Sequence, residues 1–115
     1  LKKPKMNIDE VQMNLSNLYD KASAIYKEEA EAEIEYRAIE KDEDIQLAVI
    51  QMQFDDGKVA KNKLELMAYS DPLWKEYQEG LQLLKAEWLK KKANVKAFEA
   101  KLAILRSLNK QIEIL

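Results

Sequence analysis

Apolar residues recur at alternating spacings of three and four along most of the chain, a pattern typical of helices that pack along one face. The first run follows Asn7, which forms a capping box with Glu10 and so marks a helix start. Its positions are Ile8, Val11, Leu15, Leu18, Ala22 and Ile25, followed less strictly by Ala32, Tyr36 and Ile39. The spacing slips near Ile45 and resumes at Val49. We therefore predict one long helix over residues 8–54.

Two breaks in the pattern separate this helix from the rest of the chain. The sequence Asp-Asp-Gly at residues 55–57 ends it, and Ser70–Pro72 supply a cap residue followed by a proline, which costs nothing in the first turn of a helix. We predict a short helix over residues 59–69 and a last helix over residues 72–114. The last helix keeps the three–four spacing throughout, at Trp74, Tyr77, Leu81, Leu84, Trp88, Lys91, Val95, Phe98, Leu102, Leu105, Asn109 and Ile112.

The two long helices have similar lengths, so they can fold back on one another. The predicted fold is all-α: a single helical domain over residues 1–115, built as a long, coiled-coil-like antiparallel hairpin with a short connecting helix. The last helix also has apolar residues outside its seam, more than one partner helix can cover, and they favour assembly into a homo-oligomer. These residues are Leu73, Leu83, Leu89, Ile104, Leu108 and Leu115. In the alternative, the short helix folds over this surface within one chain.

Composition removes most catalytic designs. The 115 residues contain neither cysteine nor histidine, which excludes disulfides, thiolate nucleophiles, Cys/His metal sites and imidazole acid–base catalysis. No apolar run approaches the roughly 20 residues that span a bilayer, and the first ten residues lack the pattern of a secretory signal. We expect a non-enzymatic, cytoplasmic protein with no cofactor, no metal, no small-molecule substrate and no membrane partner.

Charge is divided unevenly between the two halves. Residues 1–57 contain 7 Lys and Arg against 14 Asp and Glu, whereas residues 58–115 contain 12 against 7. An antiparallel hairpin pairs residues whose numbers sum to about 126, which sets acidic positions flanking the first seam against basic positions flanking the second. The expected neighbours are Glu33 or Glu35 beside Lys92, and Glu40 or Asp42 beside Lys85. Lys75, Lys90, Lys96 and Lys110 fall at positions that point away from the partner helix.

Other candidate chemistry has a structural explanation that we prefer. The acidic stretch at residues 28–44 lacks the Glu-x-x-His pairs of carboxylate metal sites in helical bundles, so we interpret it as a solvated, salt-bridged face. The sequence Asp-Asp-Gly-Lys at residues 55–58 is interpreted as a turn. Trp88 and Phe98 could stack on single-stranded bases, but both occupy seam positions, and we predict that they pack in the core.

The stretch "KNKLELMAYSDPLWKEYQEGLQLLKAEWLKKKANVKAFEAKLAIL", residues 61–105, carries a resemblance to a known family. The glycine break at Gly57, the Lys61–Leu64 pattern, the acidic turn at Asp71, the two tryptophans and the lysines at residues 90–92 together resemble the small phage recombination mediators of the UvsY type. This resemblance implies a homo-oligomer, in the cytoplasm of a bacterial host, that binds single-stranded DNA. It also implies a recombinase and single-strand-binding protein as partners, because such mediators help load the recombinase onto covered strands.

The position of the basic residues departs from that family. The family's strand-binding bases lie in the first half, where this chain has an acidic stretch containing only Arg37 and Lys41. Acidic surroundings repel phosphate, so we place the candidate nucleic-acid contacts elsewhere. They are Lys58, Lys61 and Lys63 near the turn, with Lys75, Lys90 and Lys96 on the outward face.

A second class of function explains the acidic half equally well. A protein-only interaction module would need no DNA contact. It could be a helical adaptor, a chaperone or a phage inhibitor of a host complex that mimics nucleic acid. Salt-dependent binding to single-stranded DNA separates the two hypotheses, because the mediator requires it and the module does not.

Overall fold

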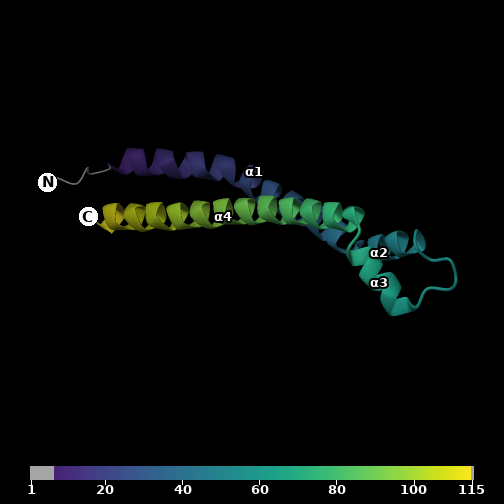
Figure 1. Ribbon diagram of the computed structural model, residues 1–115. Helices are drawn as coiled ribbons and strands as arrows, with labels where there is room; N and C mark the ends of the chain where they lie inside the picture. The colour runs from purple at the N-terminus through teal and green to yellow at the C-terminus, as the bar shows by residue number, and fades with distance from the viewer. Residues whose placement is uncertain (1–6, 115) are drawn as a thin grey trace. The chain divides into compact units, whose positions relative to one another are not determined.

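A computed structural model describes residues 7–114 of the chain, with side chains up to residue 111. The described part is all-α (Figure 1), with helices α1 (Ile8–Glu40), α2 (Glu43–Met52), α3 (Lys61–Tyr69) and α4 (Pro72–Ile114). Portions of α1 and α4 lie antiparallel, as the sequence predicts, and α3 connects the two halves. The side chain of Ile112 and the whole of Leu115 lie outside the described residues.

Helices α1 and α4 begin where the sequence predicts, whereas α3 begins at Lys61, two residues later than predicted. At α1, the side chain of Asn7 accepts a hydrogen bond from the amide of Glu10 at 2.8 Å, and its own amide group donates to the Glu10 carboxylate at 3.4 Å. At α4, the carboxylate of Asp71 accepts from the amide of Leu73 at 2.8 Å, with Pro72 in the first helical position. Both side chains satisfy amides that a helix start leaves without a partner, which confirms the two predicted caps.

The first long helix differs from the prediction, because it is interrupted after Glu40 instead of continuing to residue 54. The amide of Asp42 donates to the carbonyl of Ile39 at 3.1 Å, a three-residue spacing that tightens the last turn of α1. Asp42 then occupies the N-cap position of α2 and is followed by Glu43 and Asp44. Negative charge stabilises a helix N-terminus, so this acidic cluster favours a new helix over continuation of the old one.

The chain forms two compact units. Unit 1 contains residues 1–30 and 90–115, and its core is made by the predicted seams of α1 and α4. The buried core residues are Val11, Leu15, Leu18, Phe98 and Leu105, with Ala22, Ile25, Leu102 and Leu108 packed against them. Every one of these except Leu108 is a predicted seam position, so the periodicity identified this core correctly.

Unit 2 contains residues 31–89 and has a more dispersed core. Its buried side chains come one from each helix: Tyr36, Ile50, Ala68 and Leu81. Helix α3 packs against α2, and Leu83 and Leu89 of α4 remain exposed. The short helix therefore does not cover the surplus apolar surface of α4, contrary to the one-chain alternative.

Contacts on one flank of the hairpin fix its register. In unit 1, Arg106 donates to the hydroxyl of Tyr19, and in unit 2, Lys85 lies close enough to Glu40 to lower the pKa of its carboxyl, behind the larger effects of Tyr36 and Arg37. In both pairs the two residue numbers add up to 125, and the heptad pattern predicts a sum of about 126. The antiparallel register and the Glu40–Lys85 neighbourhood are therefore confirmed, whereas Glu33 and Lys92 belong to different units and their pairing stays a prediction.

Among residues 7–114, none of the helices combines the length and the apolar character that crossing a membrane requires.

Candidate nucleic-acid interface

The six lysines predicted to contact nucleic acid are all exposed, but they belong to different units. Unit 1 contains Lys90 and Lys96, both on α4. Unit 2 contains the other four, which are Lys58, Lys61, Lys63 and Lys75. The prediction that these lysines are exposed is confirmed. Neither the two lysines of unit 1 nor the four lysines of unit 2 are shown to form one contiguous patch.

Local hydrogen bonds position the unit 2 lysines near the turn. The carboxylates of Asp55 and Asp56 accept from the amides of Gly57 and Lys58, each at 2.9 Å, and Gly57 has a φ of 82°. These bonds shape the predicted turn, and the positive φ explains its glycine. After the Asp55–Lys58 turn, Lys61 lies in the first turn of α3. That turn of the helix contains no acidic residue to balance the charge of Lys61.

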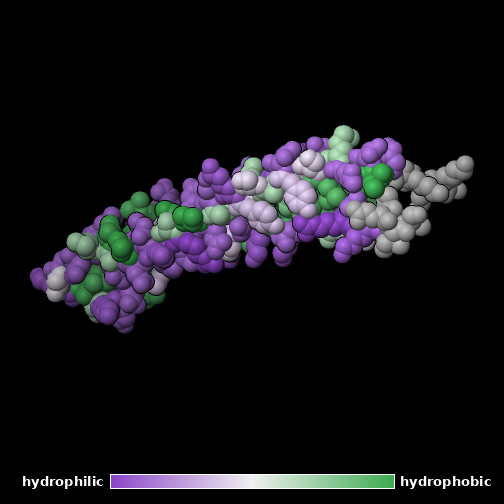
Figure 2. Space-filling model, turned by 180° about the vertical axis from the view of Figure 1, so that it is seen from behind, coloured by the Kyte–Doolittle hydropathy of each residue, from purple (hydrophilic) through white to green (hydrophobic). Residues whose placement is uncertain are grey.

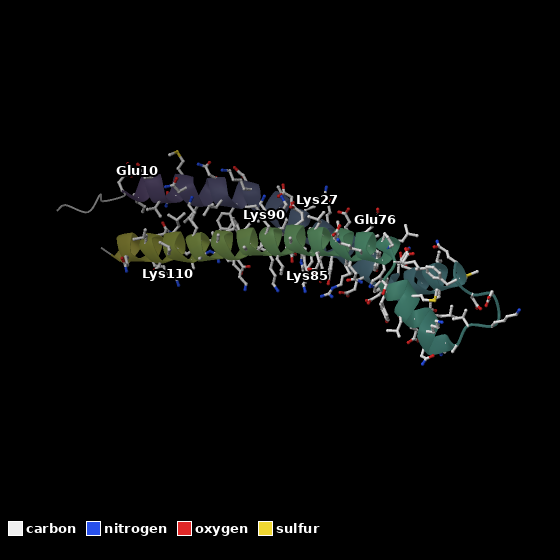
Figure 3. All side chains as sticks on the ribbon, in the orientation of Figure 1. Glu10, Lys27, Glu76, Lys85, Lys90 and Lys110 are labelled. Carbon is white, nitrogen blue, oxygen red and sulfur yellow. The ribbon has the colours of Figure 1, made fainter. Side chains whose placement is uncertain are left out.

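Lysines of α4 in unit 1 have different roles, although three are consecutive. Lys91 is half-buried and its ammonium group lies 3.3 Å from the carboxylate of Glu28 on α1, so this lysine stabilises the hairpin. Lys90 and Lys96 are exposed. Lys110, further along α4, is also exposed (Figure 3). The consecutive lysines thus combine an internal charge pairing at Lys91 with an exposed side chain at Lys90.

The two units have net charges of opposite sign. Unit 1 contains 12 Lys and Arg against 7 Asp and Glu, a net charge of +5, and unit 2 contains 7 against 14, a net charge of −7. Together they give the −2 of the whole chain. Lys2, Lys3 and Lys5 of unit 1 lie outside the described residues. The sign of the net charge favours phosphate near unit 1 and disfavours it near unit 2.

The two aromatic residues considered for base stacking are engaged within the hairpin. Phe98 is buried and meets the ring of Tyr26 edge to face, with centroids 5.9 Å apart. Trp88 stacks on buried Tyr36 at 5.5 Å, and the guanidinium of Arg37 lies 5.0 Å from the Trp88 ring. The prediction that Trp88 and Phe98 pack internally is confirmed.

Hydrogen bonds hold this aromatic stack in unit 2. The hydroxyl of Tyr36 donates to the Glu40 carboxylate at 2.5 Å, and Arg37 donates to the same carboxylate at 3.1 Å. The bond to Glu40 raises the pKa of Tyr36, and the bonds from Tyr36 and Arg37 lower the pKa of Glu40. Arg37 also lies 4.0 Å from Glu33, so the acidic stretch is salt-bridged here, as predicted.

Sequence reasoning missed an aromatic hollow in unit 1, of about 380 Å³, between α1 and α4. Tyr19 and Tyr26 line it, and they are 51% and 45% exposed. Arg106 donates two hydrogen bonds to the Tyr19 hydroxyl, at 3.1 and 2.9 Å, and its guanidinium lies 5.6 Å from the Tyr19 ring. Both tyrosines occupy the flank position next to the seam of α1, and that regular seven-residue spacing was the available signal.

Lysines flank this hollow along α4. Ala103 lines the hollow, and Lys96 and Lys110 lie seven residues before and after it, on the same helix face. The hollow also contains one acidic residue, Glu99. Unit 1 therefore combines exposed tyrosine rings and an arginine, with exposed lysines on either side.

Within residues 7–114, no group of three or more acidic residues is arranged to hold a metal ion. Comparison of the chain with protein-family models, with curated proteins and with solved structures finds no match.

Proposed function

We propose that this protein is a non-enzymatic helical binding protein whose unit 1 holds single-stranded DNA along α4. One observation carries the proposal: the hollow with Tyr19, Tyr26 and Arg106 lies between exposed Lys96 and Lys110 in a unit of net charge +5. Proteins that bind single strands combine these two features, a basic track for phosphates and aromatic rings for bases.

The two parts of the site would act on different parts of the nucleotide. The exposed tyrosine rings offer faces on which any base can stack, which gives binding without sequence preference. Lys90, Lys96 and Lys110 would neutralise phosphates and release their counterions, so affinity would fall as salt rises. The other four candidate lysines belong to the acidic unit, and we expect them to contribute less to DNA binding. They are Lys58, Lys61, Lys63 and Lys75.

The resemblance to UvsY-type mediators supplies the biological context of this proposal. In that context the protein would help load a recombinase onto single strands covered by single-strand-binding protein. Self-association forms part of the proposal, because Leu83, Leu89 and Ile104 remain 73%, 47% and 61% exposed on α4. An oligomer would present several copies of a weak site to one strand and so raise the effective affinity.

Fluorescence anisotropy with a labelled oligothymidylate of about 20 nucleotides tests the proposal. We expect the parent protein to bind, and the logarithm of its association constant to fall linearly with the logarithm of the salt concentration. The double variant Lys90→Glu with Lys96→Glu should bind more weakly. Two lost phosphate contacts should flatten the salt slope by about 1.4, since each contact contributes about 0.7 for single strands.

The matched control reverses two charges in unit 2, as Lys61→Glu with Lys63→Glu. It changes net charge by the same amount, so a smaller effect than that of the unit 1 variant would locate binding on α4. Absence of binding by the parent protein at low salt would refute the proposal, and so would parental affinity in the unit 1 variant.

The acidic surface of unit 2 favours a second candidate function, a protein-only interaction module such as an adaptor, a chaperone or a phage inhibitor of a host complex. Its net charge of −7 suits a basic protein surface and mimics the charge of nucleic acid. The same titration separates the candidates, because a protein-only module shows no binding to the oligonucleotide at low salt.

A further inference from the structure

Unit 2 contains a second hollow, of about 390 Å³, that the DNA-binding proposal does not use. The end of α1, the middle and second half of α2 and the start of α4 surround it, and its apolar wall includes Ile39, Val49 and Leu73. Val49 and Leu73 are 50% and 45% exposed. The hydroxyl of Tyr77, which also lines the hollow, donates to the carbonyl of Ile39 at 2.5 Å. This bond joins α4 to the end of α1, so two walls of the hollow are in direct contact.

Helix α2 extends this apolar surface beyond the hollow. Ile45, Val49 and Met52 lie at spacings of four and three, which places them on one face of the helix, and they are 60%, 50% and 75% exposed. Ile50, which lines the hollow itself, is buried. Figure 2 shows apolar side chains on the surface of the α2–α3 region. We call the hollow together with this face of α2 the α2 groove.

The charge around the α2 groove has one sign. Asp42 and Glu76 line the hollow, and none of the lysines and arginines within residues 7–111 does. Partial burial raises the pKa of Tyr77, and the nearby charges of Glu43, Asp42 and Glu40 raise it further, which is the effect of a negative potential at the groove wall. A phosphate-bearing ligand is disfavoured by this potential, and an apolar ligand with positive flanks is favoured.

The dimensions of the α2 groove restrict the ligand further. A hollow of about 390 Å³ holds a few side chains, and the apolar face of α2 runs beside it for about two turns. These are the anchors of one amphipathic helix lying in a groove.

We propose that the α2 groove binds a basic amphipathic helix of a protein partner, with apolar residues at three–four spacing in the groove and Lys or Arg residues beside Asp42 and Glu76. The partner is defined here by its chemistry. The site does not depend on DNA binding, because it belongs to the acidic unit and uses none of the lysines of α4.

The direct test uses a fluorescein-labelled synthetic helix of ~14 residues, about four turns, with leucines at three–four spacing and lysines on the flanks. A second peptide carries glutamates in place of the lysines, and a third has the same composition in scrambled order. Anisotropy titration against the full chain should show saturable binding of the first peptide and at least about tenfold weaker binding of the other two. Equal binding of the lysine and glutamate peptides would overturn the proposal.

Two variants locate the binding. Asp42→Asn with Glu76→Gln removes the acidic rim and retains a residue that caps helices well at position 42, so we expect about tenfold weaker peptide binding. Glu35→Gln with Glu65→Gln removes the same charge outside the groove and should leave the affinity within about twofold. Equal losses in both variants would show a general charge effect and overturn the assignment.

The apolar wall needs its own variant. Val49→Lys with Leu73→Lys replaces two half-exposed side chains, so circular dichroism should show the parental helix content while peptide binding is lost. Unchanged binding would refute the groove as the site. If light scattering shows that Val49→Lys with Leu73→Lys converts a parental oligomer into monomers, the occupant is a second copy and the partner proposal is wrong. The same variants are also tested for oligonucleotide binding. That measurement shows whether the DNA-binding proposal fails, independently of the result with the peptide.

Discussion

The stack formed by Tyr36, Trp88 and Arg37 gives the sharpest stability prediction for this hairpin. It joins α1 to α4 in unit 2, where few side chains are fully buried. The perturbation is Trp88→Ala, which removes the partner of the Tyr36 ring and the ring face under the Arg37 guanidinium. Trp88→Phe is the matched variant, because it retains an aromatic ring beside Tyr36.

The magnitude follows from the three contributions that Trp88 makes. Truncating a fully buried aromatic side chain to alanine costs about 3–5 kcal/mol, and half-buried Trp88 should lose about half of this, ~2 kcal/mol. The stacked geometry adds about 0.5–1.5 kcal/mol, and an exposed cation–π contact adds about 0.5–1 kcal/mol. We expect Trp88→Ala to lower the free energy of unfolding by about 3 kcal/mol and Trp88→Phe by about 1 kcal/mol.

Urea denaturation followed by circular dichroism measures both values, with thermal unfolding as a check. For a chain of this size, 3 kcal/mol corresponds to a decrease of about 10 °C in Tm. The chain has only two tryptophans, so Trp74→Phe leaves Trp88 as the only tryptophan, and its fluorescence follows the unfolding of a chain whose stack is intact. A loss below about 1 kcal/mol for Trp88→Ala, or equal losses for both substitutions, would refute the role of the stack.

Two further predictions concern backbone conformation and self-association. Gly57 has a φ of 82°, so Gly57→Ala should destabilise the protein by about 1 kcal/mol through strain alone, whereas Gly80→Ala in the middle of α4 should stabilise it by about 0.5–1 kcal/mol. Both sites have open space for a methyl group, and equal effects in thermal unfolding would contradict this reasoning. Light scattering at micromolar concentration should show an oligomer, which Leu83→Gln with Leu89→Gln should weaken because both side chains are exposed on α4. A monomeric parent protein would exclude self-association at that concentration.

The long-range pairing of the hairpin could be predicted from sequence because it depends on periodicity. Seam positions such as Val11 and Phe98 are buried, and the charged flank at Glu40 and Lys85 matches the predicted register. Periodicity does not identify local breaks, because a helix interrupted for two residues can resume its apolar face. The sequence feature that marks the break is the acidic cluster at residues 42–44, since consecutive acidic residues at a cap position favour a new helix start.

The candidate sites were harder to predict, because each depends on residues that are distant in sequence. Exposure of the lysines follows from their heptad positions, but the tyrosine hollow also requires Arg106 to reach Tyr19 across the hairpin. The α2 groove requires the break after Glu40, which the predicted continuous helix does not contain. Both hollows are therefore consequences of tertiary structure.

Both proposed interactions are electrostatic, and added salt should weaken both. A salt titration alone therefore cannot show which unit is responsible for a measured interaction. Charge variants do so, because Lys90→Glu with Lys96→Glu removes positive charge only from unit 1, and Asp42→Asn with Glu76→Gln removes negative charge only from unit 2. If the units bind different partners, the first variant should affect only the oligonucleotide and the second only the basic peptide. A variant that affected both ligands would contradict separate binding sites in the two units.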